Sequence, residues 1–369
     1  MNVLIITGLY PESENHTVEY ISWAVRELVI GLSRFDIHVK KVIRPMSEIS
    51  WKKVSRQEVF TTSIIDGIKV ETKSFINLPK SGFYLTWNDL KYIESSLEDV
   101  DLIVAHMLPG AYLSNAIYKK FKVDFLYVLH NNDLKSLHKQ KEILRNAKAI
   151  YTRSWALDRH LSKAGFFSRG IVYSGIDKSL IIEHLKKAKK VKSKLSFISV
   201  HRLQKLKNTD ITIKALSQLP AEYDWEYKII GDGAEYQEIM QLIKTLNIES
   251  KVKMLGFRDR DFCINEMKKS DVFVMPSAPE TFGLAYLEAM AAGCIVIGAK
   301  GWGIDGLIKN GFDGYLVEPR DIDALKKLFI NLFTKDQTEV LKNSRDTIRR
   351  FTLDEAQKNY ADLIKMNLS

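Results

Sequence analysis

The chain has 369 residues, enough for two domains with separate cores, and its hydrophobic content of 46% is ordinary for a soluble protein. No apolar run approaches the length of about eighteen residues that a membrane span needs, and no basic segment precedes the first apolar run. We therefore expect a cytoplasmic protein without a signal peptide. Its two cysteines argue against a disulfide scaffold or a cysteine-based metal site.

The net charge of +10 is unevenly distributed along the chain. Residues 1–177 carry 24 Lys and Arg against 19 Asp and Glu, residues 178–194 carry 7 against 1, and residues 195–369 carry 24 against 25. The segment 178–194 is therefore interpreted as a basic linker. A basic first half suits an anionic acceptor or an anionic membrane surface, and no nucleic-acid module is recognisable.

Strand-like apolar runs alternate with helical patterns through the first 177 residues. The first run covers residues 3–8 and precedes a helical pattern at 17–32, and others have the sequences IHVKKVI, IKVETKSF, DLIVAH, DFLYVLH and AIYTRS. This alternation predicts a doubly wound parallel sheet, which binds ligands at the carboxyl ends of its strands. Residues 51–97 are hard to assign; within them LTWNDLKYIESSL fits a helix packed on the core or one that faces a lipid-linked acceptor.

The second half repeats the α/β pattern. Strand-like runs near 195–200, 227–230, 252–257, 272–276 and 294–299 are separated by helical segments, and a last helix is expected over 352–366. The turn GDG after the second run lacks the third glycine of a dinucleotide-binding fingerprint. The acidic triplets 259–261 and 321–323 stand where helices should begin, so they are interpreted as helix starts and not as metal ligands.

The most informative stretch is PSAPETFGLAYLE, residues 276–288. Glu280 lies in a turn, Gly283 opens a helical segment and Glu288 follows one to two turns later. Free N–H groups at a helix start bind phosphate, whereas carboxylates accept hydrogen bonds from sugar hydroxyls. Phosphate and hydroxyls together suggest a nucleotide sugar. The alternative is that Glu280 is solvated and that Glu288 only favours the first helical turn.

This stretch resembles the Glu-x7-Glu motif of the retaining glycosyltransferases of family 4, and its continuation EAMAAGCIVIGAKGWGIDGLIKNGFDGYLVEP is also similar to that family. The resemblance implies the GT-B fold, an α/β architecture with two Rossmann-like domains facing a cleft. Residues 1–177 would form the acceptor-side domain, with the terminal helix 352–369 packing back on it. Residues 195–351 would form the nucleotide-sugar donor domain.

The resemblance also implies roles for individual residues. Arg202 and Lys207 would hold the donor diphosphate, Glu280 would face the donor sugar, and His130 would contact that sugar from the first domain. These four form the expected catalytic set, although a strand-end histidine also has a purely structural interpretation. The expected donor-binding residues are Gly231, Gly233, Phe257, Arg258, Phe282, Gly283, Leu284 and Glu288, the last on the ribose; the acceptor-side candidates are Asn15, His16, Thr17 and His106.

The implied activity is a retaining, metal-independent hexosyl transfer from a nucleotide diphosphate sugar to a glycan or lipid-linked acceptor in bacterial surface polysaccharide synthesis. No cofactor is expected beyond the donor substrate, with UDP preferred to GDP, and no nucleic acid is expected to bind. The enzyme would be cytoplasmic, with peripheral contact at the inner face of the plasma membrane.

Several residues depart from the family pattern and keep other functions open. They are Ser174, His201, Asn208, Trp302 and Gly306, and the loop after the first strand has no glycine between Gly8 and Gly31. These departures favour a non-catalytic subunit of a glycan-synthesis complex, and an epimerase or a phosphorylase of the same fold is a further alternative. A glycosidase is disfavoured because its two carboxylates would flank one sugar and not a phosphate site.

Overall fold

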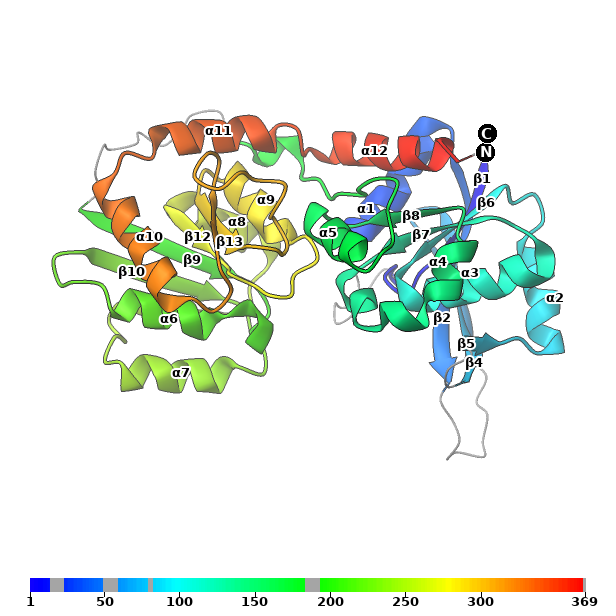
Figure 1. Ribbon diagram of the computed structural model, residues 1–369, viewed down its shortest axis with the longest axis horizontal. Coiled ribbons are helices and arrows are strands. Elements are labelled where there is room, and N and C mark those ends of the chain that lie inside the picture. The colour runs from blue at the N-terminus through cyan, green and yellow to red at the C-terminus, as the bar shows by residue number, and fades with distance from the viewer. Residues whose placement is uncertain (14–22, 49–58, 79–81, 183–192, 368–369) are drawn as a thin grey trace. The chain divides into compact units, whose positions relative to one another are not determined.

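The computed structural model describes residues 1–13, 23–48, 59–78, 82–182 and 193–367. The chain divides into two compact units (Figure 1). The first unit comprises Met1–Arg153, Leu157–Ser174 and Leu353–Ser369, and the second comprises Ser154–Ala156 and Gly175–Thr352. Of the segment 178–194 that was predicted as a linker, residues 183–192 lie outside the described residues.

The first unit is built on a sheet whose parallel strands run in the order β4-β2-β1-β6-β7-β8. The order reverses at the central strand β1, as a doubly wound sheet requires. Two further strands, β3 and β5, pair antiparallel with β4 and belong to the region that the sequence left unassigned. The strands are β1 (Asn2–Ile6), β2 (His38–Glu48), β3 (Phe60–Ile65), β4 (Ile68–Leu78), β5 (Gly82–Tyr84), β6 (Leu102–His106), β7 (Phe125–Leu129) and β8 (Ala149–Thr152).

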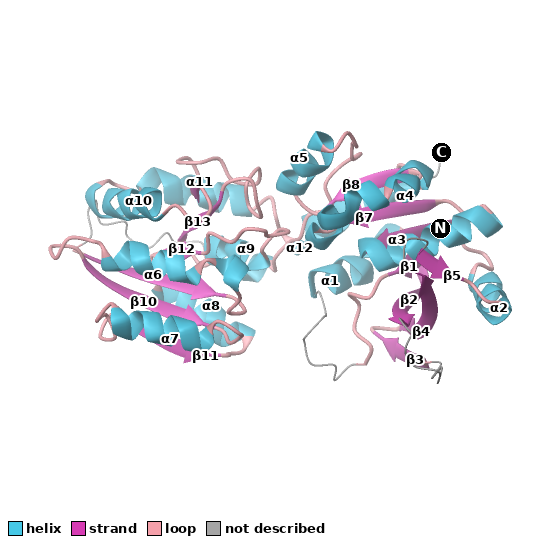
Figure 2. Cartoon of the chain, turned by 60° about the horizontal axis from the view of Figure 1, so that its bottom comes forward, coloured by secondary structure: helices cyan, strands magenta, loops and turns pink. Residues whose placement is uncertain are grey.

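Helices cover both faces of this sheet (Figure 2). Successive strand residues point to opposite faces, so Val3 and Ile5 join one core cluster while Leu4 and Ile6 join another. The first cluster includes residues of α1 (Trp23–Gly31) and α12 (Leu353–Lys365), and the second includes residues of α2 (Trp87–Ser96), α3 (Met107–Phe121), α4 (Lys141–Asn146) and α5 (Trp155–Lys163). The helix expected near the end of the chain therefore packs in the first unit, against α1.

The helix α2 packs on the core, as the first of its two interpretations predicted. Thr86 caps it by accepting a hydrogen bond from the Asp89 N–H, and Ile93 is buried in the core cluster. The buried Asp89 carboxylate pairs with the Lys73 ammonium at 3.1 Å. In the described part of the chain no helix is both long and apolar enough to cross a bilayer.

The second unit repeats the same architecture with six parallel strands in the order β11-β10-β9-β12-β13-β14. Its strands are β9 (Lys194–Val200), β10 (Asp224–Ile230), β11 (Val252–Gly256), β12 (Val272–Val274), β13 (Ile295–Ala299) and β14 (Tyr315–Val317). One core cluster joins the sheet to α6 (Thr209–Ser217), α7 (Tyr236–Thr245) and α10 (Ile322–Thr334). The remaining helices are α8 (Arg260–Lys269), α9 (Leu284–Ala291) and α11 (Thr338–Ile348), and Phe273 of β12 packs edge-on against Tyr286 of α9.

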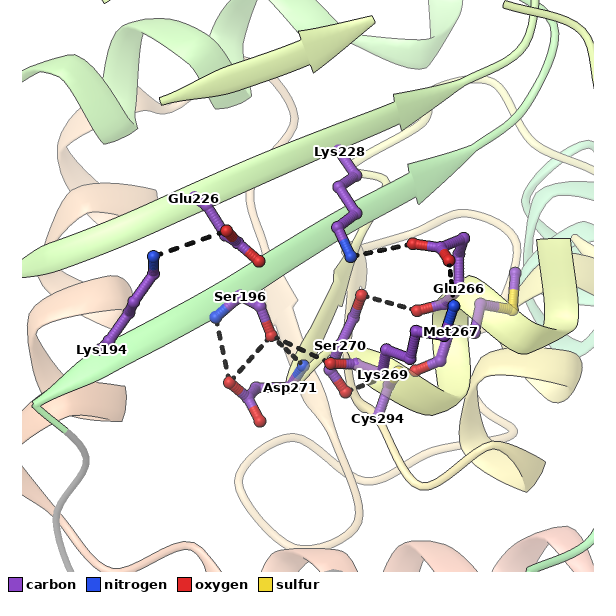
Figure 3. Close-up of polar contacts among 10 residues, drawn as sticks. All are labelled: Lys194, Ser196, Glu226, Lys228, Glu266, Met267, Lys269, Ser270, Asp271 and Cys294. Atoms are coloured by element: carbon purple, nitrogen blue, oxygen red, sulfur yellow. Dashed lines mark hydrogen bonds and ion pairs between the residues drawn. The ribbon is translucent and has the colours of Figure 1, made fainter. Parts of the chain in front are cut away.

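Polar contacts join α8 to β10 and join the start of β9 to the start of β12 (Figure 3). The Ser196 N–H and hydroxyl both donate to the Asp271 carboxylate at 3.0 Å, and the Asp271 N–H donates to the Ser196 carbonyl at 2.9 Å. Lys228 of β10 pairs with Glu266 of α8 at 2.9 Å, and the buried Cys294 thiol donates to a carbonyl of the same helix at 3.1 Å. These contacts anchor β12 at one end, and its other end leads into residues 276–288.

Candidate functional site

Several predicted site residues of the second unit lie where the strand order reverses, between β9 and β12. Parallel sheets bind ligands at this point because the loops leaving the two strands diverge. Here the two loops are tied together at their bases. The Ala278 N–H donates to the Leu206 carbonyl at 2.9 Å, and the Asn208 side-chain amide donates to the Pro276 carbonyl at 2.7 Å.

Lys207 and Glu280 lie in contact at the centre of this site. The Lys207 Nζ is 2.6 Å from the Glu280 Oε2, and their side chains are only 16% and 13% exposed. The other carboxylate oxygen of Glu280 accepts from the Thr281 N–H at 3.0 Å. The fold thus brings together two predicted catalytic residues that are 73 positions apart in the sequence. Arg202 is exposed in the same loop as Lys207.

Two glycines allow the main chain to close around Glu280. Gly283 precedes α9 with φ of 81°, and a Cβ there would lie 2.5 Å from the Tyr286 ring. The Gly303 N–H donates to the Glu280 carbonyl at 3.1 Å, and a Cβ on Gly303 would lie 2.8 Å from the Glu280 Cγ. The Phe282 side chain is buried, and Leu284 begins α9.

Two departures from the family pattern have a structural explanation. Asn208 occupies a position where the family pattern has glycine. Its φ is 54°, a left-handed conformation that asparagine tolerates better than most residues. His201 stands in the other glycine place and hydrogen-bonds the Arg202 carbonyl at 3.1 Å and the Thr209 hydroxyl at 3.3 Å. Burial and the nearby Lys207 charge lower the pKa of His201 to about 3, so it adds no second charge beside that lysine.

Gly231 and Gly233 hold the turn after β10 against the end of β9. A Cβ on Gly231 would lie 1.9 Å from the His201 carbonyl oxygen, and one on Gly233 would lie 2.4 Å from the Leu203 carbonyl oxygen. The Leu203 N–H donates to the carbonyl between the two glycines at 2.8 Å. Both glycines therefore support the loop that carries Arg202 and Lys207.

The second glutamate of the motif has a partner that the sequence did not reveal. The Arg260 Nε lies 2.7 Å from the Glu288 Oε1, and the two side chains are 56% and 12% exposed. Arg260 opens α8, and nothing in the sequence pattern linked it to α9. Phe257 is an exposed residue of the same region, where the Arg258 guanidinium covers the Phe262 ring.

The acidic triplets begin helices, as predicted. Asp259 accepts from the Phe262 N–H and Asp321 from the Ala324 N–H, each at 2.8 Å, at the starts of α8 and α10. Across the described ranges no three His, Cys, Asp or Glu side chains gather into a metal-binding group.

Cys263 is buried in α8, and its burial raises the pKa of the thiol to about 11.

In the first unit, His106 and His130 meet at the carboxyl ends of β6 and β7. The His106 Nδ1 lies 3.3 Å from the His130 Nε2, and the His106 Nε2 lies 2.8 Å from the Tyr360 hydroxyl. His106 is fully buried with both ring nitrogens engaged, so its side chain has no exposed atom to offer a ligand. The other acceptor-side candidates, Asn15, His16 and Thr17, lie outside the described residues.

Comparison with known proteins shows that part of this chain is similar to glycosyl transferases. Residues 181–350 match the family model "Glycosyl transferases group 1". N-acetyl-alpha-D-glucosaminyl L-malate synthase of Bacillus anthracis is 34% identical over 140 residues, which are 38% of this chain and 36% of that protein. UDP-Gal:alpha-D-GlcNAc-diphosphoundecaprenol alpha-1,3-galactosyltransferase of Escherichia coli is 32% identical over 152 residues, 38% of each chain. The chain thus spans little more than a third of the length of these relatives.

The fold resembles solved structures over nearly its full length. The crystal structure of Anabaena Alr3699/HepE in complex with UDP and glucose superposes with a TM-score of 0.70, covering 99% of this chain and 100% of that chain at 20% identity. At this identity the likeness shows the fold alone, and it confirms the predicted GT-B class. Residues 181–350 therefore match the group 1 glycosyl transferases, in a chain that has the GT-B fold.

Proposed function

We propose that the protein is a retaining glycosyltransferase that moves a hexosyl group from a nucleotide diphosphate sugar to a hydroxyl of a glycan or lipid-linked acceptor. The observation that supports this most strongly is the Lys207–Glu280 pair at 2.6 Å, located before the start of α9 in a group 1 domain. A cation and a carboxylate held side by side suit the two halves of such a donor, because the diphosphate needs positive charge and the sugar offers hydroxyl donors.

The proposed reaction proceeds on one face of the sugar. The bond between the anomeric carbon and the diphosphate oxygen breaks, the acceptor oxygen bonds to the same face, and the departing oxygen takes the acceptor's proton. Negative charge grows on the diphosphate, where Lys207, Arg202 and the N–H groups at the start of α9 would stabilise it. Because these groups supply the charge, we propose that neither a metal nor a cofactor is needed and that a chelator leaves the activity unchanged.

We propose UDP as the nucleotide and a bacterial surface polysaccharide as the pathway. The support is the UDP in the Alr3699/HepE structure and the UDP-galactose and diphosphoundecaprenol in the name of the Escherichia coli relative. Glu288 would accept hydrogen bonds from the ribose hydroxyls, and the region of Phe257 and Arg258 would border the base.

Thermal unfolding with a panel of nucleotide diphosphates tests the donor site. We expect UDP to raise the Tm of the wild type, since a ligand at about a hundred times its Kd adds roughly 2.7 kcal/mol to the free energy of unfolding. Glu288→Ala should reduce this rise, because the ribose loses its acceptor. Arg260→Ala breaks the same ion pair but leaves the carboxylate in place, so the rise should persist in that variant. An equal loss in both variants would contradict the role of the Glu288 carboxylate.

A non-catalytic subunit is the second candidate, supported by the departures Trp302 and Gly306 in the loop that also carries Gly303. The departure at Asn208 no longer counts in its favour, because that residue keeps the left-handed conformation of a glycine. The absence of a Tm rise with every nucleotide of the panel would favour this candidate over an active transferase.

We also propose peripheral binding to an anionic membrane, as on the inner face of the plasma membrane. The support is the excess of Lys and Arg in residues 1–177 and the exposed aromatic side chains Trp23, Tyr84 and Trp87 of the first unit. Vesicles containing anionic lipid should carry the protein in flotation at low salt and release it at high salt, because salt screens surface charge. Flotation that does not depend on the salt concentration, or the absence of flotation at either salt concentration, would contradict this proposal.

A further inference from the structure

Three parallel strands of the first unit end in nitrogen-bearing side chains. His106 ends β6, His130 follows β7 and Arg153 follows β8, and these strands are neighbours in the order β6-β7-β8. The carboxyl ends of neighbouring parallel strands lie along one edge of the sheet, which is the edge where such sheets bind ligands. The sequence pointed to the two histidines but not to Arg153.

Arg153 is buried with an incomplete set of hydrogen bonds. Arg153 is 3% exposed, and its Nη2 donates a hydrogen bond to the Ser174 hydroxyl at 2.6 Å. Its Nη1 is buried and has no hydrogen-bond partner among the described residues. A buried guanidinium donor without an acceptor is costly, and in native proteins such a group calls for a specific explanation.

One buried and one partly buried cation of the same unit have carboxylate partners. Lys73 pairs with the fully buried Asp89 at 3.1 Å, and Lys41 pairs with Glu71 at 2.9 Å. Asp133, in the loop after β7, has a buried carboxylate. This carboxylate accepts hydrogen bonds from the N–H groups of Leu108 at 2.9 Å and His130 at 2.8 Å. Within the described residues no carboxylate forms an ion pair with Arg153. Lys73 and Lys41 thus each have a carboxylate partner, whereas the Arg153 Nη1 has no partner among the described residues.

The groups around Arg153 are neutral at neutral pH. Burial, followed by the positive charge of Arg153, lowers the pKa of His106 to about 3 and holds that of His130 well below its usual range. Burial raises the pKa of the Tyr360 hydroxyl, and it lowers the pKa of Arg153 only to about 10. Arg153 therefore carries the positive charge of this cluster, and no negative group of the cluster offsets it.

We propose that Arg153, with His130 beside it, forms an oxyanion subsite at the carboxyl edge of the first sheet, and that this subsite binds a carboxylate or phosphate group of the acceptor. The inference rests on the proposed function in one respect, that the acceptor binds to the first unit. The free Nη1 hydrogen-bonds an anionic oxygen, and charge-assisted bonds of this kind are about twice as strong as neutral ones. An acceptor of the matching class is a glycan or lipid intermediate that carries a uronate or a phosphate.

Titration with inorganic phosphate and with malonate, at constant ionic strength, tests the subsite in the full chain. We expect one or both anions to raise the Tm of the wild type and to shift the imidazole NMR signals of His106 and His130. Arg153→Met should weaken the apparent affinity by about tenfold or more, because it removes a bond to a charged group. A response to phosphate alone indicates a phosphate-bearing acceptor, and a response to malonate alone indicates a carboxylate; equal responses leave the broader oxyanion class in place.

The controls separate this subsite from general charge effects and from the donor site. Arg145→Gln removes an exposed arginine of α4 and should keep the full anion response. Without added anion, Arg153→Met should be no less stable than the wild type, since replacing an uncompensated buried charge is neutral or stabilising. UDP should still raise the Tm of Arg153→Met; in the wild type, the absence of a Tm rise with every nucleotide of the panel would count against the proposed function while leaving the anion result intact.

Three outcomes would overturn the subsite. They are an unchanged anion response in Arg153→Met, the absence of any Tm rise in the wild type, and unmoved histidine signals at saturating anion. If Arg153→Met does not fold, the histidine signals of the wild type and the anion response of Arg153→Lys decide the question, because lysine keeps the charge but loses the planar donor pair.

Discussion

Lys207→Ala is expected to lower the turnover number by about a hundred- to a thousandfold while weakening donor binding far less. The ammonium lies 2.6 Å from Glu280 in a largely buried position, so in the proposed reaction it would be held in place before charge develops on the leaving diphosphate. A preorganised cation contributes mostly to the transition state, since the ground-state diphosphate carries less charge at the departing oxygen. Steady-state kinetics with a nucleotide diphosphate sugar, together with a direct donor Kd, measures both effects.

The same loop provides a matched control for this prediction. Lys205 lies two residues away, is 63% exposed and faces Glu235 and Glu238 at 3.4 and 3.8 Å. Lys205→Ala removes the same charge from the same loop and should leave the turnover number nearly unchanged, because exposed ion pairs contribute little. If Lys207→Ala only weakened donor binding at a constant turnover number, Lys207 would be a binding residue without a catalytic role.

Gly231→Ala is expected to destabilise the second unit by about 3 kcal/mol, the largest stability effect we predict. The residue has φ of 137°, and its added Cβ would meet the His201 carbonyl oxygen at 1.9 Å, so the turn would have to move away from β9. Both the backbone conformation and the steric overlap contribute to this cost. Denaturant unfolding of the wild type and the variant measures the difference.

Gly256→Ala separates the two contributions. Gly256 accepts the Gly231 N–H at its carbonyl and has φ of 67°, but a Cβ there would meet nothing within 4 Å. This variant should therefore lose only about 1 kcal/mol, the backbone cost of a left-handed alanine. Equal losses in the two variants would show that the contact with His201 relaxes at little cost. Because the turn supports the Arg202–Lys207 loop, Gly231→Ala should also reduce the UDP-dependent rise in Tm.

The sequence by itself determined the architecture of both units. Apolar periodicity identified most of the parallel strands, though not β14, and several helices, because period-2 and period-3.6 patterns report which side of an element is buried. The motif from Glu280 to Glu288 likewise located the helix start at Gly283, since a glycine that follows a strand and a turn permits the conformation found there. The antiparallel strands β3 and β5 were missed because they lie at a sheet edge, where exposure weakens the alternating pattern.

The tertiary structure decided which side chains meet. The Arg260–Glu288 pair joins α8 and α9. The hydrophobic pattern of each helix can be explained without this pair, so no local feature of the sequence could have revealed it. The incomplete hydrogen bonding of Arg153 likewise depends on the absence of an acceptor, which is a property of the folded surroundings and not of the residue. Periodicity records whether a residue is buried, but contacts between elements depend on strand order and on the paths of loops, and those are fixed only when the chain folds.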